Sequence, residues 1–250
     1  MEQKKDSLNK QLLEHDFEHA PDRWQNYLTS KLIAEHYAAA ENAVVVLSNM
    51  VSNKSYICYG RLGAKMGLGT ENEEVESIWE KKILDRIHPD DVAGKIAWEL
   101  QFLTFVQHVP AEERKDYYVQ HYLRMKDDQG CYHALRHRIF YLDYDTEGNV
   151  LLALCLYTVH NEQRAGAGIY CSLNDTRVKD ANVCAQGLLS ERECEILSLI
   201  SRGWPSKQIA EALCISVNTV NNHRQNIMRK LLCQNTTEAI SVARRLGLLQ

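Results

Sequence analysis

Amide side chains are concentrated in one short stretch of this sequence, which contains four asparagines and a glutamine between residues 218 and 226. In a helix, one stripe of the stretch would be polar throughout: Asn218, Asn221, Asn222, Gln225 and Arg229. Asparagine is a poor helix former because its amide competes for backbone hydrogen bonds, so a purely structural helix would avoid four of them. The same amides offer donor and acceptor pairs, the geometry that reads adenine N6 and N7 in the major groove. Alone, such a stripe would more often be a solvated polar face. The capped helix and the turn that precede it favour instead a surface that reads DNA.

The residues before this stretch predict the helices that position it. Ser190 and Glu193 form a capping box at the start of an apolar helix, which Gly203-Trp204-Pro205 ends. A short helix follows from Ser206, and Ser216 can cap a third helix over Val217 to Leu231. Two short helices joined this tightly predict a helix-turn-helix.

Residues Leu189 to Leu248 resemble the LuxR/GerE-type DNA-binding domain, a four-helix helix-turn-helix module of bacterial transcription regulators. The resemblance runs through Ser190 to Glu193, Ile196-Leu197, Gly203, Ser206 to Ala210, Ile215 to Val220, His223-Arg224, Lys230-Leu231, Thr237 to Ala239 and Leu246 to Leu249. Relatives often carry lysine where this chain has Asn221, and glycine where it has Leu232. The resemblance implies a homodimer through the last helix, Thr237 to Leu246, bound to double-stranded promoter or operator DNA. RNA polymerase is a further possible partner of such a regulator.

The third helix of such a module would lie in the major groove. We expect Asn221, Asn222 and Gln225 to contact base edges. Phosphates should be held by basic and hydroxyl side chains, helped by the free N–H groups at helix starts. The candidates for phosphate contacts are Lys207, Thr219, Arg224 and Arg229.

Charge is shared unevenly along the chain. Residues 188–250 carry eight Lys or Arg against five Glu, a balance of +3, and the whole-chain balance of −4 leaves −7 for the rest. A mildly basic end on an acidic body suits phosphate contacts without general adhesion to nucleic acid or membrane. No run approaches the roughly eighteen apolar residues of a membrane helix, and the N-terminus leads into no signal-peptide apolar region. We therefore expect a cytoplasmic protein.

The remaining chemistry-bearing residues do not predict an enzyme, a metal site or a cofactor. The eight cysteines include no CxxC pair, and no GxSxG, HExxH or Walker-type lysine loop is present. Cys131, His133 and His137 would share one side of a strand, but neighbours at i and i+4 are too far apart to hold one ion without residues from elsewhere. A haem- or metal-bound sensor nevertheless stays open as an alternative, which an absorption spectrum would test.

The N-terminal extension, residues 1–41, is predicted to be helical. A thin apolar stripe at Leu8, Leu12, Leu13 and Phe17 suggests a frayed helix or a partner-dependent arm. Pro21 can begin a second helix, and the side chains predicted to be buried there are Trp24, Tyr27, Leu28 and Leu32.

Residues 42–160 predict an α+β domain with one antiparallel sheet. Strands are expected at Val44 to Leu47 and Tyr56 to Tyr59, then helical segments over Glu73 to Ile87 and from Pro89 onward. A three-strand meander should follow: Tyr117 to Lys126, Cys131 to Leu142 and Asn149 to His160. This order, with His88-Pro89-Asp90-Asp91 and the Asp127 to Gly130 hairpin, resembles the PAS fold, which implies either sensing of a small-molecule ligand or other signal, or dimerisation.

Two features between these parts complete the prediction. The helix from Asp91 to His108 carries a second apolar stripe, Trp98, Phe102 and Phe105, which either packs within the domain or meets another subunit. Residues 161–187 are predicted to be a linker, with one further short strand at Ile169 to Leu173. The multidomain chain thus combines a PAS-like α+β sensor domain with an all-α helix-turn-helix domain at 188–250.

Overall fold

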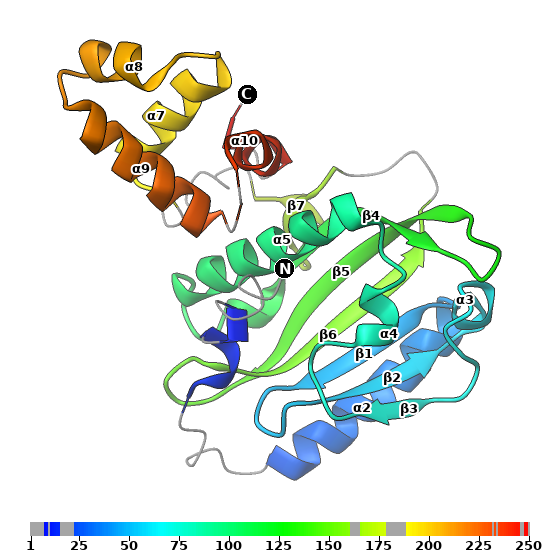
Figure 1. Cartoon of the computed structure of the whole chain (residues 1–250). Helices are drawn as coiled ribbons and strands as arrows, with labels where there is room; N and C mark the ends of the chain where they lie inside the picture. Colours follow the sequence, from blue (N-terminus) through cyan, green and yellow to red (C-terminus); the bar gives the residue numbers. More distant parts are fainter. Residues whose placement is uncertain are drawn as a thin grey trace.

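The computed structural model describes residues 8–9, 11–15, 23–160, 166–178, 189–231, 233, 235–245 and 248–249 (Figure 1). The first helix with full bounds, α2, spans Arg23–Ala40, and residues 8–9 and 11–13 form a short helical turn before it, here called the N-terminal turn. The elements that follow are β1 (Val44–Asn49), β2 (Lys54–Tyr59), α3 (Arg61–Lys65), β3 (Glu73–Val75), α4 (Lys81–Leu84), α5 (Pro89–Gln107), the 3-10 turn η1 (Arg114–Asp116), β4 (Tyr117–Lys126), β5 (Tyr132–Tyr144), β6 (Val150–Val159), β7 (Gly168–Cys171), β8 (Thr176–Arg177), α7 (Glu191–Ser201), α8 (Ser206–Ala212), α9 (Val217–Lys230) and α10 (Thr236–Arg245).

One antiparallel sheet organises the first two thirds of the chain. Its strand order is β3-β2-β1-β6-β5-β4-β7-β8. The predicted meander is confirmed: β4 pairs with β5 and β5 with β6, while β1 closes on β6. The predicted strand near Ile169 is β7, which pairs with β4. The middle part of the predicted linker therefore extends the sheet as β7 and β8, whereas residues 161–165 and 179–187 lie outside the described residues.

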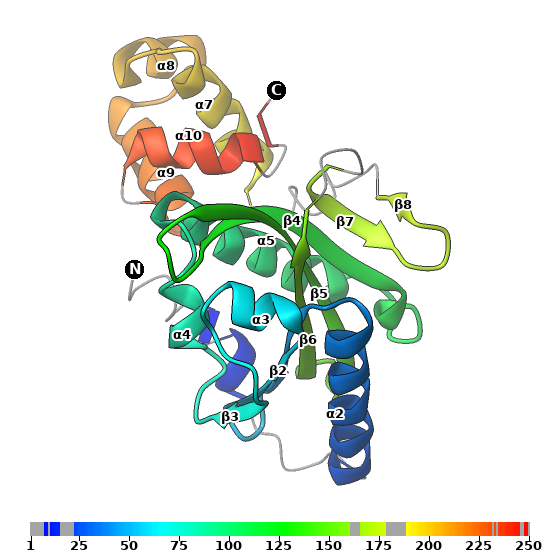
Figure 2. The same cartoon turned by 90° about the vertical axis from the view of Figure 1, so that its right-hand side faces the viewer.

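Helices cover both faces of this sheet. On one face of the sheet, Val45 and Leu47 of β1 pack against α2. On the other face, Val44 and Val46 belong to the cluster that α3 and α4 cover. Figure 2 shows α2 on one side of β1, β2 and β6, and α3 and α4 on the other. Because both faces are covered, β1 is buried at consecutive positions, unlike a strand with one solvated face.

Helix α2 is present as predicted, but its buried side was misassigned. Tyr27 is buried as expected, whereas Leu28 is 40% exposed and Leu32 is 58% exposed. The side chain of Trp24 lies outside the described residues. The side facing the sheet is instead formed by Tyr27, Ala34 and Ala38, because small side chains let the helix approach the strands closely.

The helix predicted over Glu73 to Ile87 is wrong in its first part. Residues Glu73–Val75 form β3 and pair with β2 at the edge of the sheet, and only Lys81–Leu84 are helical. The acidic run has helix-forming side chains, but the unpaired backbone groups of β2 offer a better partner. Tertiary pairing thus overrides local propensity.

Helix α5 begins where the sequence predicts and is buried along most of its length. His88 is the N-cap, Pro89 is the first helical residue, and the Asp91 carboxylate accepts hydrogen bonds from Arg124. The aromatic stripe lies inside the chain: Phe102 stacks on Tyr141 at a centroid distance of 4.7 Å.

Of the two interpretations of this stripe, the possible dimer contacts are therefore wrong. The stripe packs within its own chain. Trp98, Phe102 and Phe105 are all buried in a single copy, and Phe105 meets the edge of Tyr117 at 5.0 Å. A side chain that is already covered by its own chain has no free surface to offer a second subunit.

Helices α7 to α10 follow the sheet and lie beyond α5 (Figures 1 and 2). Helix α9 contacts α7, α8 and α10, and α10 also contacts α5. The fold is thus an antiparallel sheet with helices, followed by a helical domain. Among the described residues, no helix is long and apolar enough to span a bilayer.

Candidate nucleic-acid interface

The capping box at the start of α7 is confirmed and does more than cap the helix. The Ser190 amide donates to the Glu193 carboxylate at 2.7 Å, and the Glu193 amide donates to the Ser190 hydroxyl at 3.3 Å. The same carboxylate accepts from Lys230 Nζ at 2.6 Å, at the far end of α9. Burial opposes ionisation of Glu193, but Lys230 and the Ser190 amide outweigh it and hold the pKa of the carboxyl below its ordinary value.

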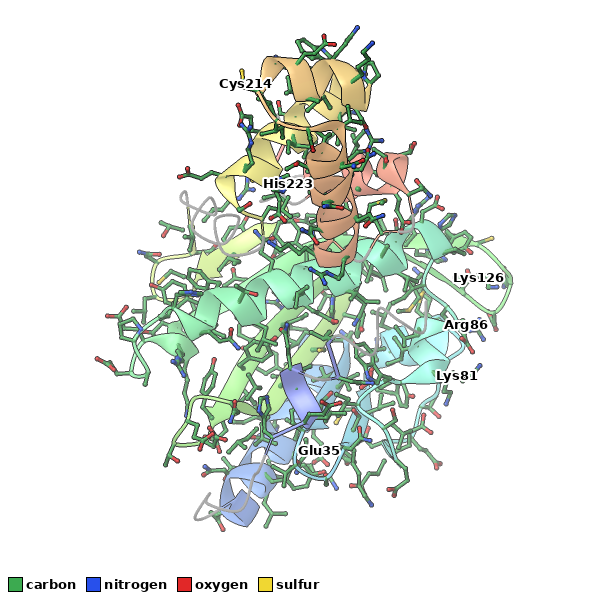
Figure 3. The ribbon with its side chains drawn as sticks, turned by 60° about the vertical axis from the view of Figure 1, so that its left-hand side comes forward. Glu35, Lys81, Arg86, Lys126, Cys214 and His223 are labelled. Atoms are coloured by element: carbon green, nitrogen blue, oxygen red, sulfur yellow. The ribbon has the colours of Figure 1, made fainter. Side chains whose placement is uncertain are left out.

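Two turns set the angles between the helices. Gly203, with φ of 85°, ends α7 as predicted, and Pro205 is the N-cap of α8. Between α8 and α9, Cys214 adopts φ of 53°, a left-handed conformation that is uncommon for residues other than glycine. Arg192 supports this turn by donating to the carbonyl of Leu213 at 2.8 Å. Figure 3 shows Cys214 at the end of the molecule farthest from the sheet.

Helix α9 begins at the predicted cap. The Ser216 hydroxyl accepts from the amide of Thr219 at 3.0 Å. Val220 and Ile227 are buried against the other helices, and Leu231 is buried just beyond the end of α9. The apolar side of the helix is therefore the predicted one.

The predicted base-contacting residues lie together on the exposed side of α9. Asn221, Asn222 and Gln225 are all exposed, and their spacing of one, three and four residues places them on one face. Asn218 extends the same face by one turn toward the start of the helix and is also exposed. Figure 3 shows α9 projecting beyond α5, with His223 at its middle. The face is thus open for a duplex to approach.

The predicted phosphate-contacting residues differ in their exposure to solvent and in their hydrogen bonds within the protein. Lys207 is exposed at the second position of α8, and Arg229 is exposed although it donates to Asn226 at 3.1 Å. Thr219 is half-buried and shares a hydrogen bond with the Ser216 hydroxyl at 2.8 Å.

Arg224 is engaged inside the domain. It donates to the Ser206 hydroxyl at 3.4 Å and to the Thr236 hydroxyl at 3.1 Å, which connects α9 with the first residues of α8 and α10. Its guanidinium has five donors, so it can keep these bonds and still meet a phosphate. Its phosphate contact stays a prediction, beside a structural role that the sequence did not reveal.

The sequence interpretation missed three residues that support α9. These are Arg192, Cys214 and Lys230, which act through a backbone carbonyl, a left-handed turn and an ion pair across 37 residues. A glycine at position 214 would have signalled the turn, but cysteine does not. Nothing in the local sequence pairs Lys230 with Glu193, because the contact depends on how α9 crosses α7.

The strand residues considered for a metal do not meet. Cys131 precedes β5 and is exposed, His133 bonds the Asp127 carboxylate at 2.7 Å, and His137 is buried against His121 at 2.8 Å. In the described part of the chain, no group of three His, Cys, Asp or Glu side chains could hold a metal ion.

Known proteins match this chain in the region of its C-terminal helices. Residues 187–243 match the family model described as "Bacterial regulatory proteins, luxR family". The oxygen regulatory protein NreC of Staphylococcus carnosus (strain TM300) is 45% identical over 62 residues, which are 25% of this chain and 29% of NreC. NreC of Staphylococcus aureus (strain JH9) is 44% identical over 63 residues, again 25% and 29%. The chain thus spans less than a third of the length of the curated relatives it matches.

Two solved structures align over most of the chain. The Vibrio cholerae VqmA dimer, described as a LuxR-type receptor, is 16% identical, with 87% and 88% of the two chains covered and a TM-score of 0.30. Escherichia coli SdiA is 17% identical, with 98% and 97% covered and a TM-score of 0.24. At such TM-scores these likenesses transfer no structural detail. Residues 187–243 of this chain thus form a domain of the LuxR family of bacterial regulatory proteins.

Proposed function

We propose that this protein is a sequence-specific transcription regulator that inserts α9 into the major groove of promoter DNA. The observation that carries the proposal is the exposed amide face of α9, Asn221, Asn222 and Gln225, on a helix that is fixed at both ends. Amides in this geometry match the donor and acceptor pair of adenine. A fixed helix can present them to one base sequence in preference to others.

Phosphate contacts would set the register of the helix on the duplex. Lys207 of α8 and Arg229 of α9 are exposed, whereas Arg224 and Thr219 are half-buried. The excess of basic over acidic residues in this part of the chain favours approach to DNA, whereas the acidic remainder is repelled by it.

The sheet domain, in this proposal, receives a signal or joins two copies. Two strands, helices and a three-strand meander support the PAS resemblance, as does a cavity between the sheet and α5. We place this domain at residues 42–178, because β7 and β8 extend its sheet. The helical domain is placed at 188–250, after the remaining linker.

Two copies are expected on the DNA, because helix-turn-helix proteins read paired half-sites. The surface proposed for the second copy is the outer side of α2, where Leu28, Leu32, Ile33 and Tyr37 are exposed. The dimer through the last helix is less favoured, since Ala239, Val242 and Ala243 of α10 are covered by the same chain.

A regulator of this kind works in the cytoplasm, where it would meet RNA polymerase.

Selection of duplexes from a random pool tests the proposed function. The full-length protein should enrich a narrow set of sequences containing adenine within each half-site. A matched control replaces Asn221, Asn222 and Gln225 by alanine; because all three are exposed, the variant should fold normally and lose the enrichment. Equal recovery of all duplexes by the unaltered protein would contradict the proposal.

A further inference from the structure

One apolar side chain lies on the otherwise polar exposed side of α9. Val217 is the first residue of the helix and is 41% exposed. It precedes Asn221 by four residues, so the two side chains lie on the same side of α9, one turn apart. Asn218 precedes Asn222 by the same spacing and is also exposed. Val217 therefore extends the amide face to the start of the helix.

The packing of the helical domain does not depend on this valine. At the start of a helix, the residue before the cap often packs against the fourth helical residue, and these positions are Ile215 and Val220. Val220 is buried, and Ile215 packs against the core cluster that contains it. Valine is also a weaker helix former than alanine, because its branched side chain loses freedom in a helix. An exposed valine at position 217 thus contributes little to the stability of the free protein.

The position of Val217, more than its exposure, indicates a role. Single exposed apolar side chains are common on protein surfaces. In the described part of the helical domain, the large apolar residues that are exposed are Trp204 and Val217, and of these Val217 belongs to α9. The first residues of a recognition helix are the ones that contact base edges. Figure 3 shows Cys214, which lies just before α9, at the end of the molecule farthest from the sheet, so the sheet domain leaves this end of α9 uncovered.

The major groove offers an apolar group that suits a valine. Thymine presents its C5 methyl group there, whereas the groups that identify adenine, guanine and cytosine are hydrogen-bond donors and acceptors. Contact between this methyl group and a valine removes apolar surface from water, and burying one such carbon group raises an affinity by about fourfold. An amide side chain would instead lose hydrogen bonds with water against the methyl group. Val217 and the amides therefore suit different bases.

The spacing along α9 relates the two kinds of base contact. Four residues of a helix advance by about 6 Å, and successive base pairs are stacked about 3.4 Å apart. With α9 in the groove, a side chain at position 217 would reach a base pair about two steps away from the one that Asn221 contacts.

We propose that Val217 recognises the C5 methyl group of a thymine, about two base pairs from the adenine assigned to Asn221. The inference rests on the proposed function, because it requires α9 to lie in the major groove. Val217 adds an apolar contact to a face that otherwise recognises bases through hydrogen bonds. Each half-site then combines an adenine with a thymine at a fixed spacing.

Replacement of thymine by uracil tests the inference, because uracil lacks only the C5 methyl group and still pairs with adenine. Each thymine of one half-site in the selected duplex is replaced in turn, and the affinity of the full-length protein is measured for every duplex. Replacement at one position should weaken binding by about fourfold. In Val217→Ala, the thymine duplex should already bind more weakly by a similar factor, and the same replacement should have no further effect.

Three variants provide matched controls. Asn221→Ala should lose the preference for adenine but still distinguish thymine from uracil at the position assigned to Val217. Trp204→Ala, at the other exposed apolar residue of the helical domain, should also keep this distinction. Val217→Ile keeps an apolar branched side chain and should keep it as well.

A second measurement does not require a variant. In the complex of the full-length protein with the selected duplex, a nuclear Overhauser effect should connect a methyl group of Val217 with the thymine methyl group, because the effect requires close contact between the two. Its absence would overturn the inference.

Two further results would overturn the assignment of Val217 while sequence-specific binding remains intact. One is an equal effect of uracil in Val217→Ala and in the unaltered protein, which would assign the methyl contact to another residue. The other is a selected duplex in which no thymine can be distinguished from uracil. If the unaltered protein selected no sequence at all, the proposed function would fail, and the role of Val217 would fail with it.

Discussion

Single side chains in the helical domain serve two purposes, and Arg224 is the clearest example. Its bonds to Ser206 and Thr236 connect three helices, while in the proposed complex its charge would also meet a phosphate. We expect Arg224→Ala to lower the free energy of unfolding by about 1 kcal/mol and to weaken binding to all duplexes alike. The slope of log affinity against log salt should fall by about 0.9, the value for one phosphate contact.

Thr236→Val serves as the matched control for this prediction. It removes one internal bond of Arg224 but keeps the charge, so stability should fall while the salt slope stays unchanged. An unchanged slope in Arg224→Ala would show that the arginine acts only within the protein.

At the scale of elements, the crossing of α7 and α9 depends on Glu193 and Lys230. Because the pKa of Glu193 is lowered in the folded state, its contribution to stability is present above the unfolded pKa, about 4.3, and is lost as pH falls through the folded pKa. Lys230→Met should lower the free energy of unfolding at pH 7 by about 1 kcal/mol, a value reduced for the partial exposure of Lys230.

Thermal unfolding of Lys230→Met between pH 3 and pH 7 checks this expectation. The difference from the unaltered protein should be full at neutral pH and should shrink below about pH 4. Arg229→Met, which removes an exposed cation on the same helix, should show little difference at any pH. A pH-independent effect of Lys230→Met would mean that its alkyl chain matters and the ion pair does not.

Helix α5 belongs to the interior of the sheet domain, and its aromatic stripe should behave accordingly. Phe102→Ala removes a fully buried ring stacked on Tyr141 and should lower the free energy of unfolding by about 3–5 kcal/mol. Leu173→Ala, at a leucine that is 76% exposed, should change it by less than about 0.5 kcal/mol. Denaturant unfolding distinguishes these values; similar small losses in both variants would contradict the assignment of Phe102 to the core.

Prediction from sequence worked where the signal was local. The capping box at Ser190, the cap at Ser216 and the start of α5 at Pro89 depend on residues within one turn of each other, and all are confirmed. The meander was also predictable, because aspartate and glycine mark its turns. Signals that depend on a distant partner were missed.

Three particular residues show why. Leu32 shares helical spacing with Leu28, yet the sheet accepts the alanine side of α2 because it packs more closely. Glu73 lies in a run that favours helix, yet β2 offers a ladder partner. From sequence, Arg224 is one more basic residue of α9. Its hydroxyl partners come from α8 and α10, which only the folded structure brings close to it.

On the scale of the whole molecule, the exposed side of α2 is the surface proposed to join two copies of the protein. Leu32→Asp places a charge in the surface proposed for the second copy and should shift the protein toward monomer, because a buried unpaired charge is strongly unfavourable. Light scattering over a range of concentrations checks this, with Val51→Asp as the control at another exposed apolar residue. An unaltered mass distribution in Leu32→Asp would exclude this surface.

The central claim is that α9 reads bases while residues around it hold phosphates, and one comparison tests it most directly. Affinities of Asn221→Ala and Lys207→Ala are measured for a selected duplex and a scrambled one over a range of salt concentrations. Asn221→Ala should reduce the discrimination between the two duplexes by about 1–3 kcal/mol, whereas Lys207→Ala should weaken both equally and lower the salt slope by about 1. If Asn221→Ala kept the full preference for the selected duplex, the account of how this protein recognises DNA would be wrong.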